Sequence, residues 1–384
     1  MDKYSIVKKL IEMNKVKLSG ICMFFAVLLL TGCESKENPP LDESEQLPEE
    51  LEQWPDGQNV YVAGYEREEN NSTVRLWRNG VIQDIDGDIG NTEARSVFVS
   101  GNDVYVAGHE VILNGSDAIM HARLWKNGVI QNLTKGDFSD EATSVFVSGD
   151  DVYVLGREEI QYNRHALKFW KNGEAEVFAE GNSKWQINSI FVSDDDVYIA
   201  GCMAYNVGNS IALQVRLWKN GVEEELANGT NNSCANSVFV SGNDVYVAGY
   251  EYDTPKNIPV AKLWKNGNAE SLTDGTKDAQ AYSVFVSNND VYVVGNDGDE
   301  TKLWKNGIEQ DIVDAKVAMM PNSVFVSGDD VYITGHIRVV QEVEPGSEIV
   351  PLALHQASIW RNGKKLSLPV ERNNSSIAYS IFVK

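Results

Sequence analysis

The 384-residue sequence has little proline, little cysteine and a shortage of positive charge. Its 10 Pro and four Cys sit within a globular composition that is 42% hydrophobic and 23% charged. The longest apolar run, "ICMFFAVLLL" at residues 21–30, is shorter than the roughly 20 residues that a membrane-spanning helix needs. Lys and Arg number 33 against 56 Asp and Glu, so the net charge is −23. Such a chain repels phosphate backbones, which argues against nucleic acid as a partner.

Motifs of common catalytic and metal sites are also missing. The five histidines show no zinc spacing such as His-Glu-x-x-His. They are His109, His121, His165, His336 and His355. The sequence has no Gly-x-Ser-x-Gly elbow, no phosphate-binding loop and no Cys-x-x-Cys pair. We therefore expect no cofactor and no metal.

Residues 1–32 have the character of a secretory signal peptide. Five Lys precede the short apolar run, which ends in "LTGC", Leu30 to Cys33. An apolar residue, two small residues and Cys resemble a bacterial lipobox, whose Cys is lipidated and becomes the mature N-terminus. We expect lipidation of Cys33, with translation starting at Met1 or Met13. The alternative is an ordinary signal peptide with a Cys nearby.

Residues 33–53 are predicted to be a tether. After Cys33 the chain is acidic, contains three Pro and has no apolar periodicity, so it cannot bury enough surface to fold. A flexible tether of this length would span roughly 25 Å. An acidic stretch after a lipidated Cys also resembles surface-export signals of some Gram-negative lipoproteins. We expect a lipid anchor in the cell envelope, at the outer membrane, with the periplasmic or surface-facing side left open.

Residues 54–384 contain seven copies of one repeat. "SVFVSGNDVYVAG" occurs verbatim at residues 96–108 and 237–249. The Tyr of the "VY" motif recurs every 40 to 48 residues, at Tyr61, Tyr105, Tyr153, Tyr198, Tyr246, Tyr292 and Tyr332. A second motif, "LWKNG" and its variants, follows each one, at Trp77, Trp125, Trp170, Trp218, Trp264, Trp304 and Trp360.

Each copy is predicted to form four strands. Strand A is "SVFVS", strand B "DVYVAG", strand C "ARLWK" and strand D a segment such as "VIQNLT". Gly-Asn, Gly-Asp, Asp-Asp or Asn-Asn between A and B, and Asn-Gly between C and D, predict two-residue type I′ hairpins. No helical periodicity follows the tether.

Both faces of each small sheet are apolar, which predicts burial on both sides. Four-stranded units of this length, repeated seven times, predict an all-β, seven-bladed β-propeller. The first copy begins at "NVYVAG" without a strand A, whereas "YSIFVK", residues 379–384, is a strand A with nothing after it. The C-terminal strand is therefore expected to complete blade one and close the ring.

The repeat resembles those of the kelch and WD40 propellers over essentially the whole of residues 54–384. It lacks their diagnostic motifs, having no Trp-Asp strand end with an upstream Gly-His and no Gly-Gly pair on strand B. "LWKNG" is similar to the repeat of bacterial lipoproteins with uncharacterised propellers. The resemblance implies architecture and not activity.

Residues that recur in nearly every copy are expected to be structural. The Gly ending strand B is predicted to allow a turn or close packing. The Trp of each copy is predicted to fill the space between blades, with a ligand-stacking ring as the alternative. The Asp after the A–B turn is predicted to accept local backbone hydrogen bonds, with a calcium ring as the alternative. These Asp are Asp103, Asp151, Asp196, Asp244, Asp290 and Asp330.

Function is expected where the copies differ. The A–B and C–D turns should share one face of a propeller, and the longer B–C and D–A loops the other. The B–C loops are predicted to be long and individual at residues 109–122, 202–215, 250–261 and 336–357. We expect ligand recognition on this second face.

Two sets of positions on that face are candidates for ligand binding. The residues just before strand A should line the mouth of the central channel: Arg95, Thr143, Asn188, Asn236, Tyr282, Asn322 and Tyr379. The residues just after the strand-B Gly are Tyr65, His109, Arg157, Cys202, Tyr250, Asn296 and His336. The candidates singled out for ligand binding are Arg95, His109, Arg157, Asn188, Asn236, Tyr250, Tyr282, Asn322, His336 and Tyr379. Such side chains suit stacking and hydrogen bonding with sugars or peptides, and a solvated rim is the alternative.

Cys202 and Cys234 are the cysteines that remain beside Cys22 and Cys33. An oxidising compartment would allow a disulfide between them. Both are predicted to lie on loops of the fourth repeat, so the bond would pin a local loop and not the blade frame.

The leading hypothesis is a monomeric, non-catalytic, lipid-anchored binding protein for a glycan or protein ligand. The first alternative is a propeller enzyme of the polysaccharide lyase or hydrolase type. Its channel-mouth residues would be Arg95, His109, Arg157, Tyr282 and His336. The second alternative is a structural subunit of a cell-envelope complex, docking through the apolar run in residues 339–354.

Overall fold

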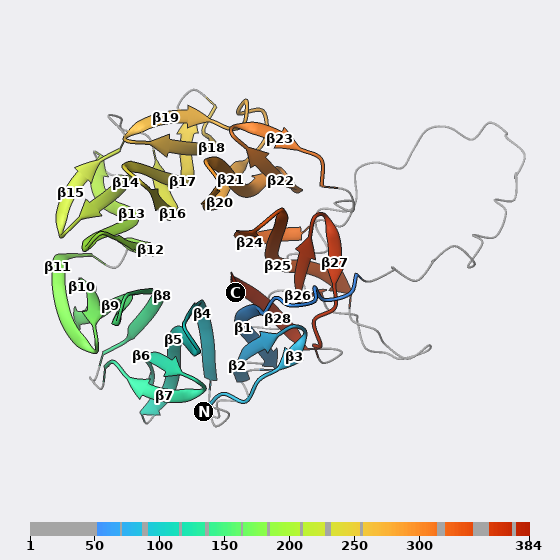
Figure 1. The fold of residues 1–384 in the computed structure, drawn as a ribbon. Helices are drawn as coiled ribbons and strands as arrows, with labels where there is room; N and C mark the ends of the chain where they lie inside the picture. Colours follow the sequence, from blue (N-terminus) through green and yellow to red (C-terminus); the bar gives the residue numbers. More distant parts are fainter. Residues whose placement is uncertain are drawn as a thin grey trace, which may run out of the picture. The chain divides into compact units, whose positions relative to one another are not determined.

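The computed structural model describes residues 52–69, 71–86, 91–114, 117–134, 138–162, 164–182, 185–207, 210–226, 232–253, 256–312, 319–340, 353–370 and 374–384. The predicted signal peptide, Cys33 and nearly all of the predicted tether lie outside these residues. The described residues form seven antiparallel sheets of four strands each, arranged as a ring of blades (Figure 1). The predicted all-β, seven-bladed propeller is confirmed.

The two inner strands of each blade are 8 to 12 residues long. The innermost strands are β4 (Asn91–Ser100), β8 (Asp140–Ser148), β12 (Gln186–Ser193), β16 (Ser233–Ser241), β20 (Ala279–Ser287), β24 (Met319–Ser327) and β28 (Ser375–Val383). The second strands are β1 (Val60–Glu68), β5 (Asp103–Asn114), β9 (Asp151–Gln161), β13 (Asp196–Val207), β17 (Asp244–Asp253), β21 (Asp290–Asp297) and β25 (Asp330–Val340).

The two outer strands complete each blade, and the outermost strand is usually short. The third strands are β2 (Asn71–Arg78), β6 (Asp117–Lys126), β10 (Arg164–Lys171), β14 (Ser210–Lys219), β18 (Ile258–Lys265), β22 (Glu300–Lys305) and β26 (Ala353–Arg361). The outermost strands are β3 (Val81–Ile82), β7 (Val129–Asn132), β11 (Glu174–Asn182), β15 (Val222–Glu225), β19 (Asn268–Ser271), β23 (Ile308–Gln310) and β27 (Lys364–Leu366).

Blade one is built from both ends of the propeller. Its strand order is β28-β1-β2-β3, and β28 pairs antiparallel to β1 with Val62 opposite Ile381. The prediction that the C-terminal strand closes the ring is confirmed. Side chains from both strands, including Val60 and Val383, are buried together.

The type of each hairpin turn depends on its two central residues. In the C–D turns both residues have positive φ, for example 52° at Asn127 and 82° at Gly128, as the predicted type I′ turn requires. The A–B turns divide into two kinds. Asp194 and Asp195 both have positive φ. In the two Gly-Asn turns only the glycines, Gly101 and Gly242, do, which is the type II′ pattern. Type I′ is therefore wrong for the Gly-led A–B turns, because Gly can occupy the first position of a type II′ turn without a Cβ clash.

Each repeated Asp holds the two turns of its blade together. Asp103 Oδ1 accepts from Asn127 Nδ2 at 2.7 Å, and Oδ2 lies 2.8 Å from Lys126 Nζ and 3.3 Å from the Tyr105 hydroxyl. These bonds, from Lys126 first and then Asn127, lower the pKa of Asp103. The partners are side chains and not the predicted backbone groups. Because the carboxylates are used in this way, they do not form the alternative calcium ring, and no group of three His, Cys, Asp or Glu in the described residues is placed to hold a metal.

The repeated Trp residues pack between blades, as predicted. Trp77 of blade one is buried among its own Val62 and the Tyr332 and Ile359 side chains of blade seven. The other six are buried too, so the alternative of a ligand-stacking ring is wrong.

Seven phenylalanines line the central channel. They are Phe98, Phe146, Phe191, Phe239, Phe285, Phe325 and Phe382, one from each innermost strand. Each ring contacts the next, with centroid distances between 4.5 and 5.1 Å, and Phe382 contacts Phe98 to complete the cycle. A closed cycle formed by the innermost strands has to surround the axis, so the channel is apolar at this level.

The predicted long B–C loops are mostly extensions of strands. Residues 109–114 belong to β5 and continue its pairing with β6 as far as Asn114 opposite Asp117. The same happens in blades four, five and seven, where β13, β17 and β25 run on past the repeated Gly. The prediction of loops is therefore wrong for these segments. Residues 341–352, which include most of the apolar run proposed for docking, lie outside the described residues.

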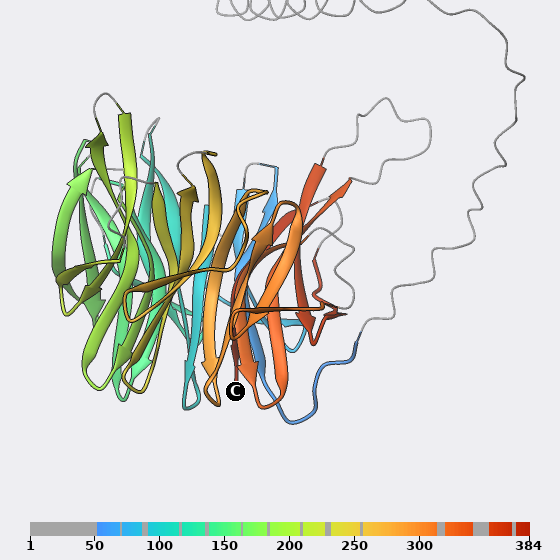
Figure 2. The ribbon, with the colours of Figure 1, turned by 90° about the horizontal axis from the view of Figure 1, so that it is seen from above.

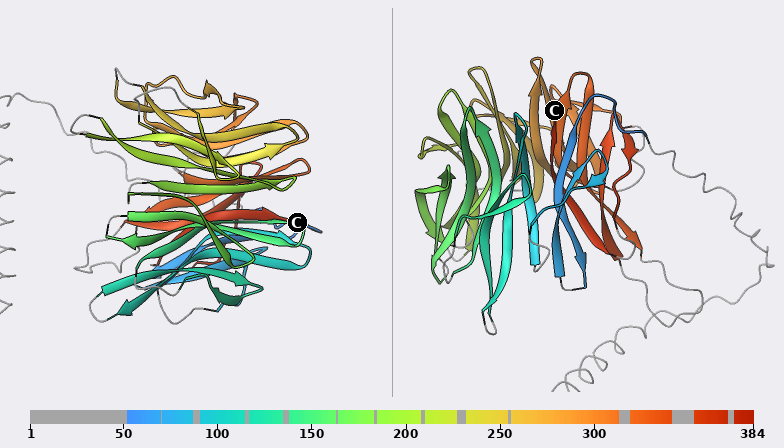
Figure 3. Two further views of the ribbon diagram at one scale, coloured as in Figure 1. Left: turned by 90° about the vertical axis from the view of Figure 1, so that its left-hand side faces the viewer. Right: turned by 60° about the horizontal axis from the view of Figure 1, so that its bottom comes forward.

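The two faces of the propeller differ. The turn face carries the short A–B and C–D turns, and the hairpin face carries the B–C hairpins (Figures 2 and 3). The first described residues reach the ring at the turn face. The Tyr332 hydroxyl donates to Gln58 Oε1 at 2.6 Å, and Glu52 forms a parallel bridge with Leu366. The chain therefore enters the propeller opposite the hairpin face (Figure 2).

Candidate functional site

The mouth of the channel on the hairpin face is built from seven β-bulges. Each innermost strand has one residue without a partner in its pairing with the second strand. These residues are Arg95, Thr143, Asn188, Asn236, Tyr282, Asn322 and Tyr379. A bulge turns its side chain away from the ordinary alternation of a strand. The whole predicted channel-mouth set therefore occupies one structural position, repeated around the ring.

The repeated Gly of strand B is required by the bulge. A Cβ at Gly108 would lie 2.0 Å from the carbonyl oxygen of Glu93, just before the bulge on the facing strand. The equivalent distance in the other six blades is 1.9 to 2.2 Å. The prediction of close packing is confirmed, but the Gly does not end strand B, which continues toward the hairpin face.

A third set of residues at the channel mouth was not predicted from the sequence. The residue after each strand-B Gly pairs with the residue two before the bulge, so that His109 faces Glu93 and Arg157 faces Glu141. The partners in blade order are Ile377, Glu93, Glu141, Gln186, Cys234, Gln280 and Met320. Each of these residues comes two positions before a predicted channel-lining residue, and this spacing could have identified them from the sequence.

Blades one and two bring together a compact group that we call the charged sector: Tyr65, Arg67, Glu93, Arg95 and Tyr379. Glu93 accepts from both arginines, with Oε1 2.6 Å from Arg67 Nη2 and Oε2 3.0 Å from Arg95 Nη2. The Arg67 guanidinium carbon lies 5.0 Å from the centroid of Tyr65, and that of Arg95 lies 4.5 Å from the centroid of Tyr379. The two tyrosine rings are 6.0 Å apart. Each arginine is therefore fixed by a carboxylate and an aromatic ring.

The arginines of the charged sector face solvent and the carboxylate lies beneath them. The side chain of Glu93 is 9% exposed, whereas those of Arg67 and Arg95 are 46% and 30% exposed. A guanidinium has five N–H donors, and one carboxylate cannot occupy those of two arginines. The surface offered to a ligand is accordingly rich in hydrogen-bond donors and positive charge.

Protonation states in this sector follow from burial and from the neighbouring charges. Burial, helped by Tyr379 and Glu93, raises the pKa of Tyr65 to about 12. Burial works to lower the pKa of Arg95, but Tyr379, Glu93 and Glu141 together raise it above its ordinary value. Burial, and next the charge of Arg95, lowers the pKa of His109, so its imidazole is neutral at pH 7. His109 is almost wholly buried, and its Nδ1 has no hydrogen-bond partner among the described residues.

A third arginine and a second carboxylate extend the charge into blade three. Arg157 Nε lies 2.8 Å from Glu141 Oε1, and Glu141 also acts on the pKa values of Arg95 and His109. Arg95, His109 and Arg157 are thus brought together with two carboxylates. Of the residues proposed for an enzyme, Tyr282 and His336 come from blades six and seven and are not part of this group.

The three predicted asparagines hold blades together. Asn188 Nδ2 donates to Ala235 O at 2.7 Å, Asn236 Nδ2 to Ala281 O at 2.9 Å, and Asn322 Nδ2 to Ala378 O at 2.9 Å. Each acceptor belongs to the innermost strand of the next blade. Their amide groups are therefore engaged in the frame.

The remaining candidates lie in blades five to seven. Burial raises the pKa values of Tyr250 and Tyr282, and Tyr252 packs edge-on against Tyr250 at 5.9 Å. His336 packs edge-on against His355 with ring centroids 4.7 Å apart. Burial, followed by the charge of His355, lowers the pKa of His336 to about 4.

Cys202 and Cys234 form a disulfide. Cys202 lies on β13 of blade four and Cys234 on β16, the innermost strand of blade five, and both are buried. The prediction of a local loop staple is wrong, because both strands extend further toward the hairpin face than expected. The bond links two neighbouring blades at the channel mouth.

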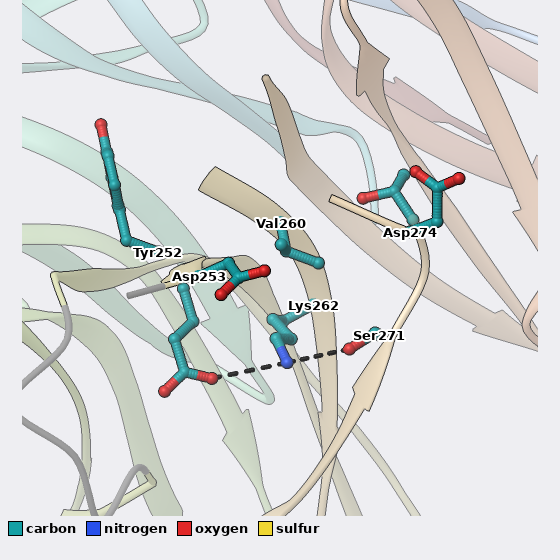
Figure 4. Close-up of a pocket in the computed structure, with 8 residues that line it drawn as sticks. Tyr252, Asp253, Val260, Lys262, Ser271 and Asp274 are labelled. Atoms are coloured by element: carbon teal, nitrogen blue, oxygen red, sulfur yellow. Dashed lines mark hydrogen bonds and ion pairs between the residues drawn. The ribbon is translucent and has the colours of Figure 1, made fainter. Parts of the chain in front are cut away.

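Two clefts lie away from the charged sector. The first, of about 280 Å³, is formed by blade five, where Lys262 Nζ lies 2.9 Å from Ser271 Oγ and 3.4 Å from Glu251 Oε2 (Figure 4). The second, of about 270 Å³, lies between blades four and five around Trp264 and Leu226. Neither includes a bulge residue.

No protein-family model and no curated protein matches the chain. Solved structures do. The β-propeller domain of the trilobed protease from Pyrococcus furiosus is 12% identical, over 82% of this chain and 95% of that chain, with a TM-score of 0.47. An acylaminoacyl peptidase from Pyrococcus horikoshii is 14% identical, over 73% of this chain and 46% of that one, with a TM-score of 0.42. A chain of a nidogen/laminin complex is 11% identical, over 66% and 92%, with a TM-score of 0.37.

These similarities concern the fold alone, which the strand pairing of this chain already establishes. Among the described residues, no helix is long and apolar enough to cross a membrane.

Proposed function

We propose that the protein is a lipid-anchored binding protein of the bacterial cell envelope, attached to the outer membrane through Cys33. It acts as a monomer without catalysis. Its hairpin face engages a glycan or protein ligand outside the cytoplasm, and the channel mouth forms the centre of that face.

The observation that carries this proposal is the opposition of the two faces. The turn face repeats the same Asp, Lys and Asn contacts in blade after blade, and the first described residues dock there. The hairpin face differs from blade to blade. Residues that the repeated frame does not require are free to recognise a ligand, so recognition is proposed for the hairpin face.

The chemistry of the mouth supports binding. The charged sector combines arginine donors with tyrosines, two residue types that are enriched at binding hot spots. Its arginines are held in place by Glu93 and by the aromatic rings, so little side-chain entropy remains to be lost when a ligand binds.

The anchor is tested by substituting Cys33. The Cys33→Ser chain should move from the detergent phase to the aqueous phase in phase partition and should incorporate no labelled fatty acid. Cys22→Ser is the matched control and should behave as the natural chain. Unchanged partition of the Cys33→Ser chain would refute the lipid anchor.

Binding is tested by screening the purified chain against a glycan array and a panel of envelope and extracellular proteins. Ligands should be lost when Arg95 is replaced by Gln and retained when Lys126, a turn-face residue, is replaced by Gln. If binding of a ligand is lost in the Lys126→Gln chain and kept in the Arg95→Gln chain, the ligand binds at the turn face, and the proposal of a hairpin-face site is wrong.

A second candidate function is a lyase or hydrolase acting on a polysaccharide. It is favoured by the neutral, buried His109 beside Arg95 and Glu93, an arrangement in which a base and a positive charge lie together. Incubation with acidic polysaccharides should then release unsaturated or reducing ends, and His109→Ala should abolish the release. Intact polymer after prolonged incubation favours the binding role.

A further inference from the structure

The rim of the hairpin face is uneven. In blade two, β5 continues from Gly108 to Asn114 before the chain turns, whereas in blade six β21 stops at Asp297, two residues beyond Gly295. Each strand residue adds about 3.3 Å, so the hairpin of blade two rises roughly 13 Å above that of blade six. Blades three and four also carry tall hairpins, formed by β9 with β10 and β13 with β14.

The tall hairpins of blades two to four carry exposed apolar side chains near their tips. Leu113 is 74% exposed, Tyr162 is 91% exposed and Ile211 is 45% exposed. Leu113 has an apolar counterpart in blade seven, Val340, which is 70% exposed, but in four other copies the equivalent position is Gln161, Asn206, Thr254 or Glu69. An apolar residue there is therefore not required by the frame. Exposed apolar residues on the turn face are different, since Val81, Val129, Val222 and Ile308 occupy one repeated position after the Asn-Gly turn.

Below the tall hairpins lies the positive part of the mouth. The charged sector belongs to blades one and two, and the Arg157 and Glu141 pair belongs to blade three. His109 adds a buried nitrogen without a partner among the described residues. The apolar tips thus belong to blades two to four and the arginines to blades one to three, so that blades two and three carry both.

We propose that this sector is a docking surface for a protein partner that inserts an acidic side chain against Arg95 and Arg67 while its apolar surface packs on the tips at Leu113, Tyr162 and Ile211. This inference rests on the proposed binding function and names its partner class. Leu and Ile offer nothing to sugar hydroxyls, whereas apolar, Tyr and Arg side chains together are typical of the centre of a protein interface. A carboxylate is the group that matches a guanidinium in shape and charge.

Charge limits what kind of protein fits. The chain carries a net charge of −23, so an acidic partner would be repelled at long range. The carboxylate must therefore stand alone on a surface that is otherwise apolar or basic. Binding should then weaken with added salt much less than binding between two oppositely charged surfaces does.

The test uses the full chain, purified in detergent and immobilised, with two probes. One is a phage-displayed library of random peptides, and the other is a pair of polysaccharides, a polyuronate and a neutral glucan. Selected peptides should carry Asp or Glu beside apolar residues. Arg95→Gln and Leu113→Ser should each weaken their binding about tenfold or more, as expected for hot-spot residues.

Val129→Ser is the matched control for Leu113→Ser, because it removes an exposed apolar residue from the turn face. It should leave peptide binding unchanged. Thermal melting of each variant checks the fold, and Leu113→Ser, which is exposed, keeps the test valid if Arg95→Gln is unstable.

Three outcomes contradict the inference in different ways. Peptides that bind Leu113→Ser and Arg95→Gln as well as the natural chain would place docking elsewhere. Polyuronate binding that depends on Arg95, without peptide binding, would assign a glycan and leave the proposed binding function standing. Absence of binding by both probes would reject the protein partner and weaken the binding function itself.

Discussion

The guanidinium of Arg95 covers the ring of Tyr379, with 4.5 Å between the guanidinium carbon and the ring centroid. Arg95 belongs to β4 of blade two, and Tyr379 belongs to β28, the strand that closes blade one. The contact therefore joins the closing strand to the neighbouring blade. The same side chains that form the candidate site also help to keep the ring shut.

This double role predicts an energetic coupling between the two residues. In a double-mutant cycle of Arg95→Ala and Tyr379→Ala, we expect a coupling of about 0.5 to 2 kcal/mol in the free energy of unfolding. The reference cycle is Lys171→Ala with Tyr153→Ala, a cation and ring of the turn face where Lys171 is more exposed. The coupling energy of this reference cycle should be smaller. If the effects of Arg95→Ala and Tyr379→Ala on the free energy of unfolding are simply additive, their contact contributes nothing to stability.

The pairing of glycine with bulge predicts a large difference between two Gly→Ala substitutions. Gly108→Ala should destabilise the protein by about 2 to 4 kcal/mol, since its Cβ would overlap the Glu93 carbonyl oxygen 2.0 Å away. Gly101→Ala meets no atom within 4 Å and is strained only by its φ of 54°, which should cost about 1 kcal/mol. Denaturant unfolding of both variants provides the measurement. Equal effects would contradict the role assigned to the bulge.

The disulfide between Cys202 and Cys234 links two blades and should therefore stabilise the fold. Replacing Cys202 and Cys234 by Ala should lower the free energy of unfolding by about 2 to 4 kcal/mol, since the unfolded chain loses its cross-link. A reductant should lower the melting temperature of the natural chain and leave that of the variant unchanged. If natural and variant chains melt together under oxidising conditions, the bond is energetically neutral.

His336 predicts a stability that depends on pH. Its pKa is about 4 in the fold and 6.5 in the unfolded reference. As pH falls below 6.5 the unfolded state takes up a proton that the folded state refuses, so stability is present above pH 6.5 and is lost progressively toward pH 4.

The pH effect of His336 is isolated by comparison with His336→Gln. The difference in unfolding free energy between the two chains should be constant above pH 7 and should shift in favour of the variant as the pH falls. A difference that does not change between pH 7 and 4 would contradict the burial argument.

The frame of the propeller was predictable because its determinants are local and repeated. The blade pattern could be predicted from the Asn-Gly turns and from the alternation of residues around Tyr105. The closure of the ring could be predicted because the first copy lacks a strand A, which β28 supplies. The repeated Trp also followed from its recurrence, since a residue that fits every blade has to serve the contacts between blades.

The features that were missed depend on pairing between strands. The bulge at Arg95 is invisible in β4 alone and becomes evident only when Ala94 and Ser96 are matched to Gly108 and Ala107. The extension of β5 to Asn114 was likewise hidden, because its length is set by the partner β6 and not by turn residues near Gly108. Glu93 was overlooked for the same reason.

The pairing of β28 with β1 also bears on how the chain is made. At a synthesis rate of about 5 to 20 residues per second, the roughly 300 residues between these strands take on the order of 15 to 60 s to emerge. During that interval β1 has one unsatisfied edge, and unsatisfied strand edges invite pairing with other chains. Blade one therefore gains its innermost strand only when the last strand of the propeller is present.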